Sequence, residues 1–220
     1  MELPLGESLP QQTPTGELVN AVTHGVGLAL SLAGGSVLIS RSVASGNVLR
    51  IMGCGVFATA LIAVYAASTL SHVAKPPWRR RFRILDQGLI YLLIVGTFTP
   101  LALEYLRSSW GWLLLMLMWV VALVGFVSKI WFTHRIDAVT IWSYIVLGWL
   151  PIMPAAAYAG LVPEEVQWGV LIGGLCYTVG TIFLVLDVRR FQFHAIWHLF
   201  VIAGSACHFA VVLQFVASRP

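Results

Sequence analysis

The sequence predicts an all-α integral membrane protein, a bundle of seven transmembrane helices with a cytoplasmic N-terminus and an external C-terminus. Of its 220 residues, 59% are hydrophobic and only 10% are charged, and the mean hydropathy is +0.87. A soluble domain carries about 25% charged residues. In lipid every backbone polar group must bond within the protein, and a run of about 20 apolar residues achieves this as a helix.

Seven apolar stretches of about 18–25 residues are each long enough to cross a bilayer. Their approximate limits are 18–40, 48–72, 87–106, 111–130, 138–158, 166–187 and 195–217. The fourth has the least certain end, because Lys129 lies there. The longest connection, roughly 73–86, contains Pro76-Pro77, which ends the second span. We therefore expect a short N-terminal segment, 1–16, followed by a single transmembrane domain, 17–217.

The N-terminal segment is not expected to be a secretory signal peptide. Residues 1–17 are polar, contain three glutamates, and lack a basic region followed by an apolar core. The first span is therefore expected to remain in the mature protein.

The distribution of basic residues predicts the orientation. On the N-terminal side the loops carry nine: Lys75, Arg79, Arg80, Arg81, Arg83, Lys129, Arg135, Arg189 and Arg190. The other side carries four: Arg41, Arg50, Arg107 and Arg219. The positive-inside rule places the N-terminus in the cytoplasm. Topology and contact with anionic headgroups explain the cluster at 79–83, so no nucleic-acid partner is expected.

The most informative stretch is His194-Ala-Ile-Trp-His198, at the start of the last apolar run. On a helix, the four-residue spacing stacks both imidazoles on one face, about 6 Å apart along the axis. Both ring nitrogens could then bind one metal ion at about 2.0–2.1 Å. The pair is a candidate half of a metal site.

Two more candidate ligands fall at the same membrane depth. His72 ends the second span and Asp86 opens the third, both on the predicted cytoplasmic side, where His194 and His198 open the seventh. The orientation was derived from Lys and Arg residues alone. The shared depth of these four residues therefore supports the metal site independently of the motif. Ionisable groups in membrane spans are costly and usually mark a functional site. The four residues together predict a metal site built from three helices.

Further polar residues accompany these candidates. Ser68 lies one turn before His72 on the same helix face. A second polar stripe, at spacing i, i+3 and i+7 in the first span, consists of Glu17, Asn20 and His24. Taken singly, each has a simpler interpretation. Asp86 could cap the third helix, His24 could be an interfacial residue, and Ser68 could be a packing serine.

Three other features are expected to be structural. His208 lies 14 residues after His194, about 21 Å along a helix, so one ion cannot contact both. A hydrogen bond from His208 to a neighbouring helix is expected instead. Asp187 is interpreted as a boundary residue. The spacing Gly169-x3-Gly173 would allow two helices to approach closely, without indicating which helix is the neighbour.

These patterns together resemble the hemolysin III family, which belongs with the progestin and adipoQ receptors, including the adiponectin receptors. The similar patterns are Glu17-x2-Asn20-x2-Thr23-His24-Gly25, Ser68-x3-His72, Asp86 and His194-x3-His198. The likeness runs from about residue 16 to 210. The short N-terminus looks like the bacterial branch, which implies the cell membrane. One departure is the stretch Arg190-Phe-Gln-Phe193, where the family would be expected to carry a proline.

The resemblance implies a seven-helix bundle with an internal N-terminus and a zinc ion near the cytoplasmic face. By carry-over, the zinc ligands are His72, His194 and His198, Asp86 holds the catalytic water, and Ser68 lies close by. Three protein ligands plus water form an open, catalytic type of zinc site. Asp86 would act as the general base, and Ser68 would hydrogen-bond the water or a developing oxyanion.

The favoured hypothesis is a zinc-dependent hydrolase of a membrane lipid, acting on a ceramide-like amide or an acyl ester in membrane lipid homeostasis. A second hypothesis is a non-enzymatic sensor or regulator in which zinc only braces the helices. A third is a haemolytic, membrane-lysing protein. It has little physical support, because the chain carries no export signal and is apolar throughout. The sequence leaves the oligomeric state open.

Overall fold

The computed structural model describes residues 14–131, 138–152, 160–187 and 192–219, and regular structure in these ranges is entirely helical. The α-helices are α1 (Pro14–Ala44), α2 (Val48–Val73), α3 (Trp78–Tyr105), α4 (Ser109–Trp131), α5 (Ala138–Trp149), α6 (Glu164–Leu186) and α7 (Gln192–Val212). A 3-10 turn, η1 (Leu150–Ile152), follows α5, and a π-helical turn, η3 (Leu213–Ala217), extends α7. The predicted all-α class is confirmed.

Six of these helices are long and apolar enough to cross a membrane: α1, α2, α3, α4, α6, and α7 continued through η3. The exception is α5, whose 12 residues fall short of the roughly 20 that a span needs. The predicted fifth span, 138–158, is helical as far as Ile152, and its remainder lies outside the described residues. Most of the predicted segment 1–16 also lies outside them. A seventh crossing therefore stays a prediction.

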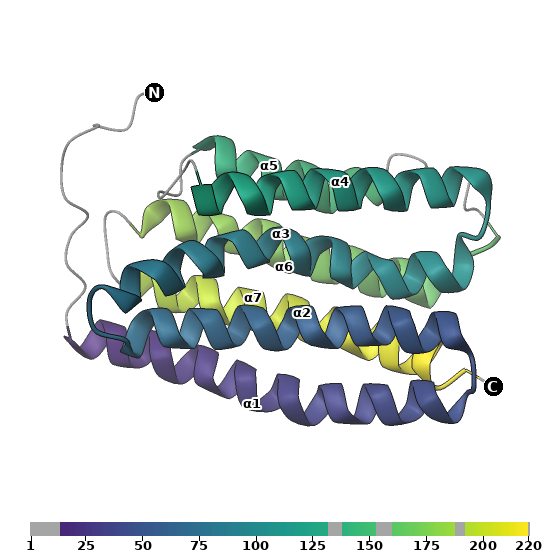
Figure 1. The fold of residues 1–220 in the computed structure, drawn as a ribbon, viewed down its shortest axis with the longest axis horizontal. Coiled ribbons are helices and arrows are strands. Elements are labelled where there is room, and N and C mark those ends of the chain that lie inside the picture. The colour runs from purple at the N-terminus through teal and green to yellow at the C-terminus, as the bar shows by residue number, and fades with distance from the viewer. Residues whose placement is uncertain (1–13, 132–137, 153–159, 188–191, 220) are drawn as a thin grey trace.

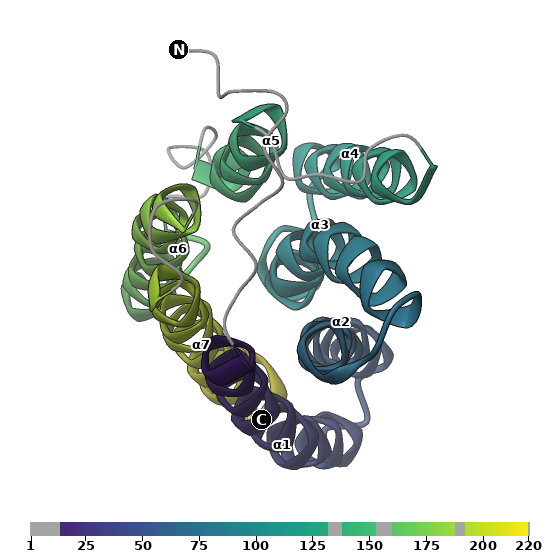
Figure 2. The same ribbon diagram turned by 90° about the vertical axis from the view of Figure 1, so that its left-hand side faces the viewer.

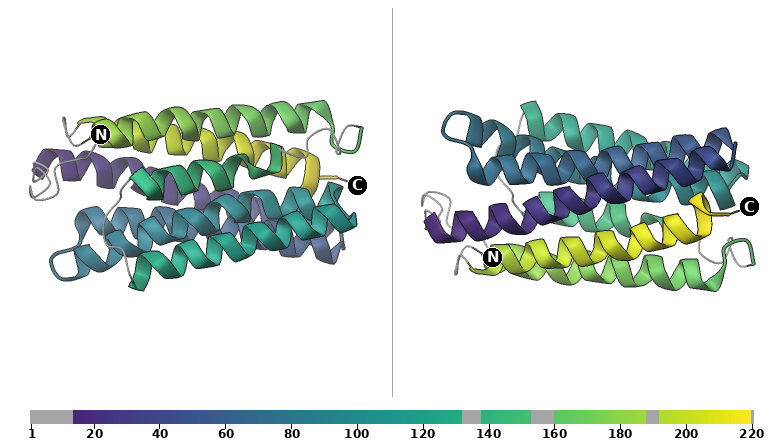
Figure 3. Two further views of the ribbon diagram at one scale, coloured as in Figure 1. Left: turned by 90° about the horizontal axis from the view of Figure 1, so that it is seen from above. Right: turned by 90° about the horizontal axis from the view of Figure 1, so that it is seen from below.

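The helices lie along one common axis, and consecutive helices run in opposite directions (Figure 1). Viewed end-on, they form a ring in which α3 lies nearest the centre (Figure 2). Views from above and below show that α1 and α7 are neighbours, although they are the first and last helices of the chain (Figure 3). The start of α1, the end of α2 and the starts of α3 and α7 share one end of the bundle.

The start of α3 differs from the prediction. The third span was expected from residue 87, with the basic cluster in a loop, but the helix already begins at Trp78. Pro77 immediately precedes it, and the fixed φ of proline suits a helix start. Arginine is a good helix former, so the first turns extend beyond the apolar run. Hydropathy marks where the membrane begins, and the helix begins earlier.

The Gly169-x3-Gly173 motif packs against α7. A Cβ atom on Gly169 would overlap the side chain of Val211, and one on Gly173 would overlap the ring of His208. Beside them, His208 Nε2 lies 3.1 Å from the carbonyl oxygen of Val170 on α6. The expected hydrogen bond from His208 to a neighbouring helix is therefore confirmed, and the neighbour is now known.

The outward faces of the helices are apolar. On α4, for example, Trp112, Met116, Val120 and Val124 are exposed. The interior of the bundle instead contains polar links between helices. The Tyr65 hydroxyl donates to Ser205 Oγ at 2.9 Å, which joins α2 to α7. Apolar surface outside and polar contacts inside suit a helix bundle surrounded by lipid.

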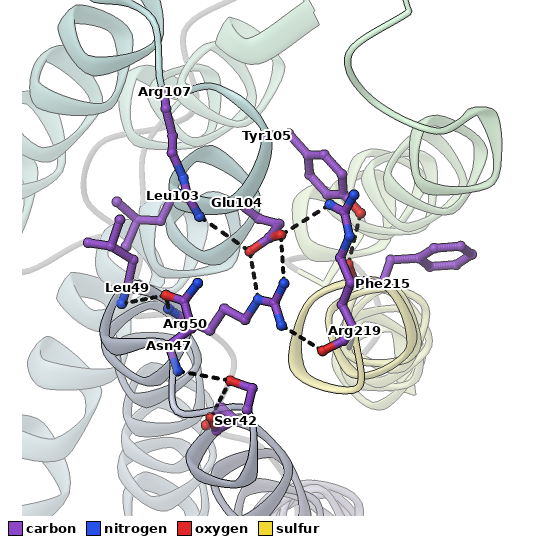
Figure 4. A network of polar contacts seen from close by, with 11 residues as sticks. Ser42, Asn47, Leu49, Arg50, Leu103, Glu104, Tyr105, Arg107, Phe215 and Arg219 are labelled. Atoms are coloured by element: carbon purple, nitrogen blue, oxygen red, sulfur yellow. Dashed lines mark hydrogen bonds and ion pairs between the residues drawn. The ribbon is translucent and has the colours of Figure 1, made fainter.

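A charged network joins three chain segments at the end of the bundle where α3 ends (Figure 4). Arg50 of α2 contacts Glu104 of α3 through two nitrogens, at 3.0 and 3.2 Å. Arg219 contacts the same carboxylate at 3.1 Å, and its carbonyl oxygen accepts a hydrogen bond from Arg50 Nη1. Nearby, the Tyr105 hydroxyl donates to the carbonyl oxygen of Phe215. These contacts attach the C-terminal segment to α2 and α3.

Candidate metal site

Three histidines from two helices meet at the end of the bundle opposite the charged network. His72 lies in the last turn of α2, while His194 and His198 lie in the first two turns of α7. A ligand atom from each lies within 4.8 Å of the other two, and the ring centroids are 4.5–5.3 Å apart. Among the described residues, no other group of three or more His, Cys, Asp or Glu side chains has this geometry.

Each of these histidines has its Nδ1 atom next to an oxygen of another helix or its cap. The pairs are His72 with Glu17 Oε2 (2.7 Å), His194 with Asp187 Oδ2 (3.0 Å) and His198 with Thr23 Oγ1 (3.1 Å). An ionised carboxylate only accepts hydrogen bonds, so the first two Nδ1 atoms carry the proton. The Thr23 hydroxyl donates to the Asn20 carbonyl oxygen and is therefore an acceptor for His198. Nε2 of each ring remains available for a metal.

Ser68 and Asp86 lie next to the three histidines. Ser68 is buried one turn below His72. The Asp86 carboxyl is close enough to the Ser68 hydroxyl and to the His194 ring to interact electrostatically with both. The alternative that Asp86 caps the third helix is wrong, because α3 begins at Trp78. A carboxylate and a hydroxyl therefore face the same region as the imidazoles.

Glu17 connects three helices at the edge of the site. Its Oε2 atom contacts His72, and its Oε1 atom accepts from Arg79 at 3.4 Å and from Arg83 at 3.1 Å. Its side chain is only 13% exposed. The carboxylate thus ties α1 to the end of α2 and to the first turns of α3.

The rest of the predicted polar stripe on α1 is buried against the site. Asn20 and His24 are both almost fully buried, so the interfacial alternative for His24 is wrong. The His24 ring stacks on His198 with centroids 3.5 Å apart, and its edge meets Tyr65. Neither ring nitrogen of His24 has a hydrogen-bond partner in the described part of the chain. The structure thus places His24 next to the three-histidine group, but His24 is not one of its members.

Two contacts to the histidines were not expected from the sequence. Thr23 entered only as part of a motif, and Asp187 was interpreted as a boundary residue, yet each binds the Nδ1 atom of a histidine. The sequence feature that could have indicated the Asp187 contact is its carboxylate, seven residues before His194. For Thr23 there was only its position beside His24. The basic residues Arg135, Arg189 and Arg190, used for the predicted orientation, lie outside the described residues.

Comparison with known proteins agrees with these features. The model of the haemolysin-III-related family matches residues 12–209. The chain belongs to this family. It is 39% identical to hemolysin-3 of Bacillus cereus over 202 residues, 91% of each chain, and 36% identical to the hemolysin-3 homolog of Bacillus subtilis strain 168 over 206 residues, 93% of this chain and 96% of that protein.

This hemolysin III family member also has a human relative. It is 24% identical to the human monocyte to macrophage differentiation factor over 213 residues, which covers 91% of this chain and 84% of that protein. The match supports membership of the wider superfamily that contains the progestin and adipoQ receptors. Together with six apolar helices, the family identifies a multi-pass protein of the bacterial cell membrane.

Proposed function

We propose that this hemolysin III family member is a zinc-dependent hydrolase of a membrane lipid. The observation that carries the proposal is the group of three imidazoles whose Nδ1 atoms are already bonded, which leaves three Nε2 atoms for one ion. Imidazole ligands suit zinc, and zinc-bound histidines commonly donate their other N–H to a carboxylate or another oxygen. His72, His194 and His198 would hold the ion.

The side chains around the histidines support hydrolysis over a purely structural ion. A zinc ion held by the three histidines would supply a Lewis acid for a carbonyl group and for water. The Asp86 carboxylate would accept the proton of the attacking water. The Ser68 hydroxyl would donate a hydrogen bond to the oxyanion that develops on the substrate. Burial strengthens both interactions, because the surroundings screen them less than water does.

The surroundings of the site support a lipid as the substrate. The basic residues of α3 gather at this end of the bundle, so the positive-inside rule favours a cytoplasmic N-terminus and a site at the inner leaflet. The neighbouring outward faces of α1 and α2 expose apolar side chains such as Leu18 and Val73. An amide or acyl ester near a lipid headgroup, as in a ceramide-like molecule, would reach this depth. We further propose that α5 completes a seventh span and that the protein acts in membrane lipid homeostasis.

Elemental analysis and a lipid-turnover assay test the proposal. Purified protein should contain about one zinc ion per chain and hydrolyse a fluorescent ceramide or another acyl lipid. His194→Ala should lose both the zinc and the turnover, because it removes one of three ligands. His208→Gln is the matched control, since it changes a buried histidine of the same helix outside the site.

A zinc-free wild-type protein would contradict the zinc site. Turnover that persists unchanged in His194→Ala would contradict its catalytic role. Stoichiometric zinc without turnover of any acyl lipid would favour the structural ion of a sensor.

A further inference from the structure

A groove lies between the start of α1 and the end of α2, beside the three histidines. Its volume is about 440 Å³. The lining residues are Pro14, Glu17, Leu18, Ala21, His72, Val73 and Arg79. Because His72 forms part of its wall, the groove reaches from the outer surface of the bundle to the edge of the candidate metal site.

One side of the groove is apolar and faces outward. Leu18 of α1 is 63% exposed and Val73 of α2 is 58% exposed, while Ala21 of α1, which also lines the groove, is buried. In a membrane protein, side chains exposed on the outside of the bundle contact lipid chains. Alanine leaves space there that a larger side chain would fill. This side of the groove therefore suits an acyl chain.

The other side of the groove carries excess positive charge. Arg79 lines the groove, and Arg83 lies outside the lining but contacts the same carboxylate, that of the lining residue Glu17. Glu17 also contacts His72, so its single negative charge is shared. The arginine side chains are 36% and 41% exposed, so they can accept a further anion. Guanidinium groups bind phosphate well because their N–H groups match its oxygens. This side of the groove therefore suits a phosphate headgroup.

We propose that the groove binds one anionic phospholipid of the adjacent leaflet, with its phosphate on Arg79 and Arg83 and an acyl chain along Leu18 and Val73. Binding requires neither zinc nor hydrolysis, so the site goes beyond the proposed function.

The test measures binding of fluorescent phosphatidylglycerol to the detergent-solubilised full chain, treated with a chelator. Working without zinc separates the result from the hydrolase proposal, since Glu17 links the arginines to His72. Arg79→Gln should weaken binding about tenfold or more, as expected for the loss of a charge-assisted hydrogen bond. Arg80→Gln is the matched control, because it removes the same charge next to the groove from a residue that does not line it.

A second pair of variants tests the groove itself. Ala21→Phe should fill the groove and abolish binding while leaving every arginine in place. Val19→Phe, at an exposed neighbouring position of α1 outside the lining, should bind like wild type. Thermal unfolding of each variant checks that the fold is retained.

Three results would overturn the proposal. Equal losses of lipid binding in Arg79→Gln and Arg80→Gln would mean that binding depends only on the overall surface charge. Full binding by folded Ala21→Phe would place the lipid elsewhere. Competition by glycerol phosphate at concentrations similar to the lipid would indicate a site for small anions. Zinc content and turnover play no part in these outcomes, so the two proposals fail independently.

Discussion

At the scale of single residues, the candidate ligands are held by partners that belong to other helices. Glu17 illustrates this best, because one carboxylate oxygen fixes the ring of His72 while the other accepts from two arginines. A bonded Nδ1 atom defines the tautomer and leaves Nε2 of the same ring as the nitrogen that can bind a metal. Such partners tune the affinity of a metal site although they never touch the ion.

We expect Glu17→Gln to lower the affinity for zinc by roughly 10- to 100-fold, because the amide leaves His72 less firmly oriented and less basic. Competition with a fluorescent zinc chelator measures the change. Glu165→Gln, on an exposed glutamate in the first turn of α6, should leave the affinity unchanged. Equal affinities in all three proteins would show that the contact with Glu17 does not support the metal.

At the scale of helices, small residues decide which surfaces meet. The two glycines of the Gly169-x3-Gly173 motif lie against Val211 and His208 of α7, so α6 and α7 approach closely. This approach also supports the site, since α6 ends at the Asp187 cap, which contacts His194. The packing of one helix pair and the orientation of one histidine are therefore connected.

Gly173→Ala should destabilise the protein by about 1–3 kcal/mol, the usual cost of overpacking, because the new methyl group would overlap the ring of His208. Its neighbour provides the control. At Gly174 a Cβ atom would lie 3.8 Å from Trp149, an ordinary contact, so Gly174→Ala should be neutral or slightly stabilising. Thermal unfolding in detergent measures both variants. Identical transitions would contradict the close contact between Gly173 of α6 and His208 of α7.

At the scale of the whole molecule, the two ends of the bundle have different organisation. One end holds the histidines and the groove. The other holds the network in which Glu104 balances Arg50 and Arg219 (Figure 4). Glu104 and Arg50 are largely buried, and a buried charge that loses its partner is costly. This end is therefore expected to contribute stability, and the histidine end to contribute function.

Glu104→Gln should lower the free energy of unfolding by about 3–5 kcal/mol, because Arg50 would remain buried without its counter-ion. Arg107→Gln removes a half-exposed partner 3.7 Å from the same carboxylate and should cost at most about 1 kcal/mol. Thermal unfolding ranks the two variants. Zinc content should stay at the wild-type level in both variants. An equal loss of stability in the two would show that the buried Arg50–Glu104 pair is no more important than the exposed Arg107 contact.

The sequence by itself determined the helical membrane class, the gathering of His72, Asp86, His194 and His198 at one end of the bundle, and their resemblance to a known family. Hydropathy and helical period are local properties of the chain, so they can be read without knowing which helices meet. For the same reason they misplaced the start of α3, whose first turns extend beyond the apolar run.

Only the tertiary structure decided that α1 and α6 complete the site through Glu17, Thr23 and Asp187. It also decided that the glycine motif faces α7 and that the groove lies between α1 and α2. The physical reason is that lipid is as apolar as the outside of a helix, so hydrophobicity does not determine which helices pack together in a membrane. Close packing of small residues and buried hydrogen bonds make that choice, and both depend on contacts between distant parts of the chain.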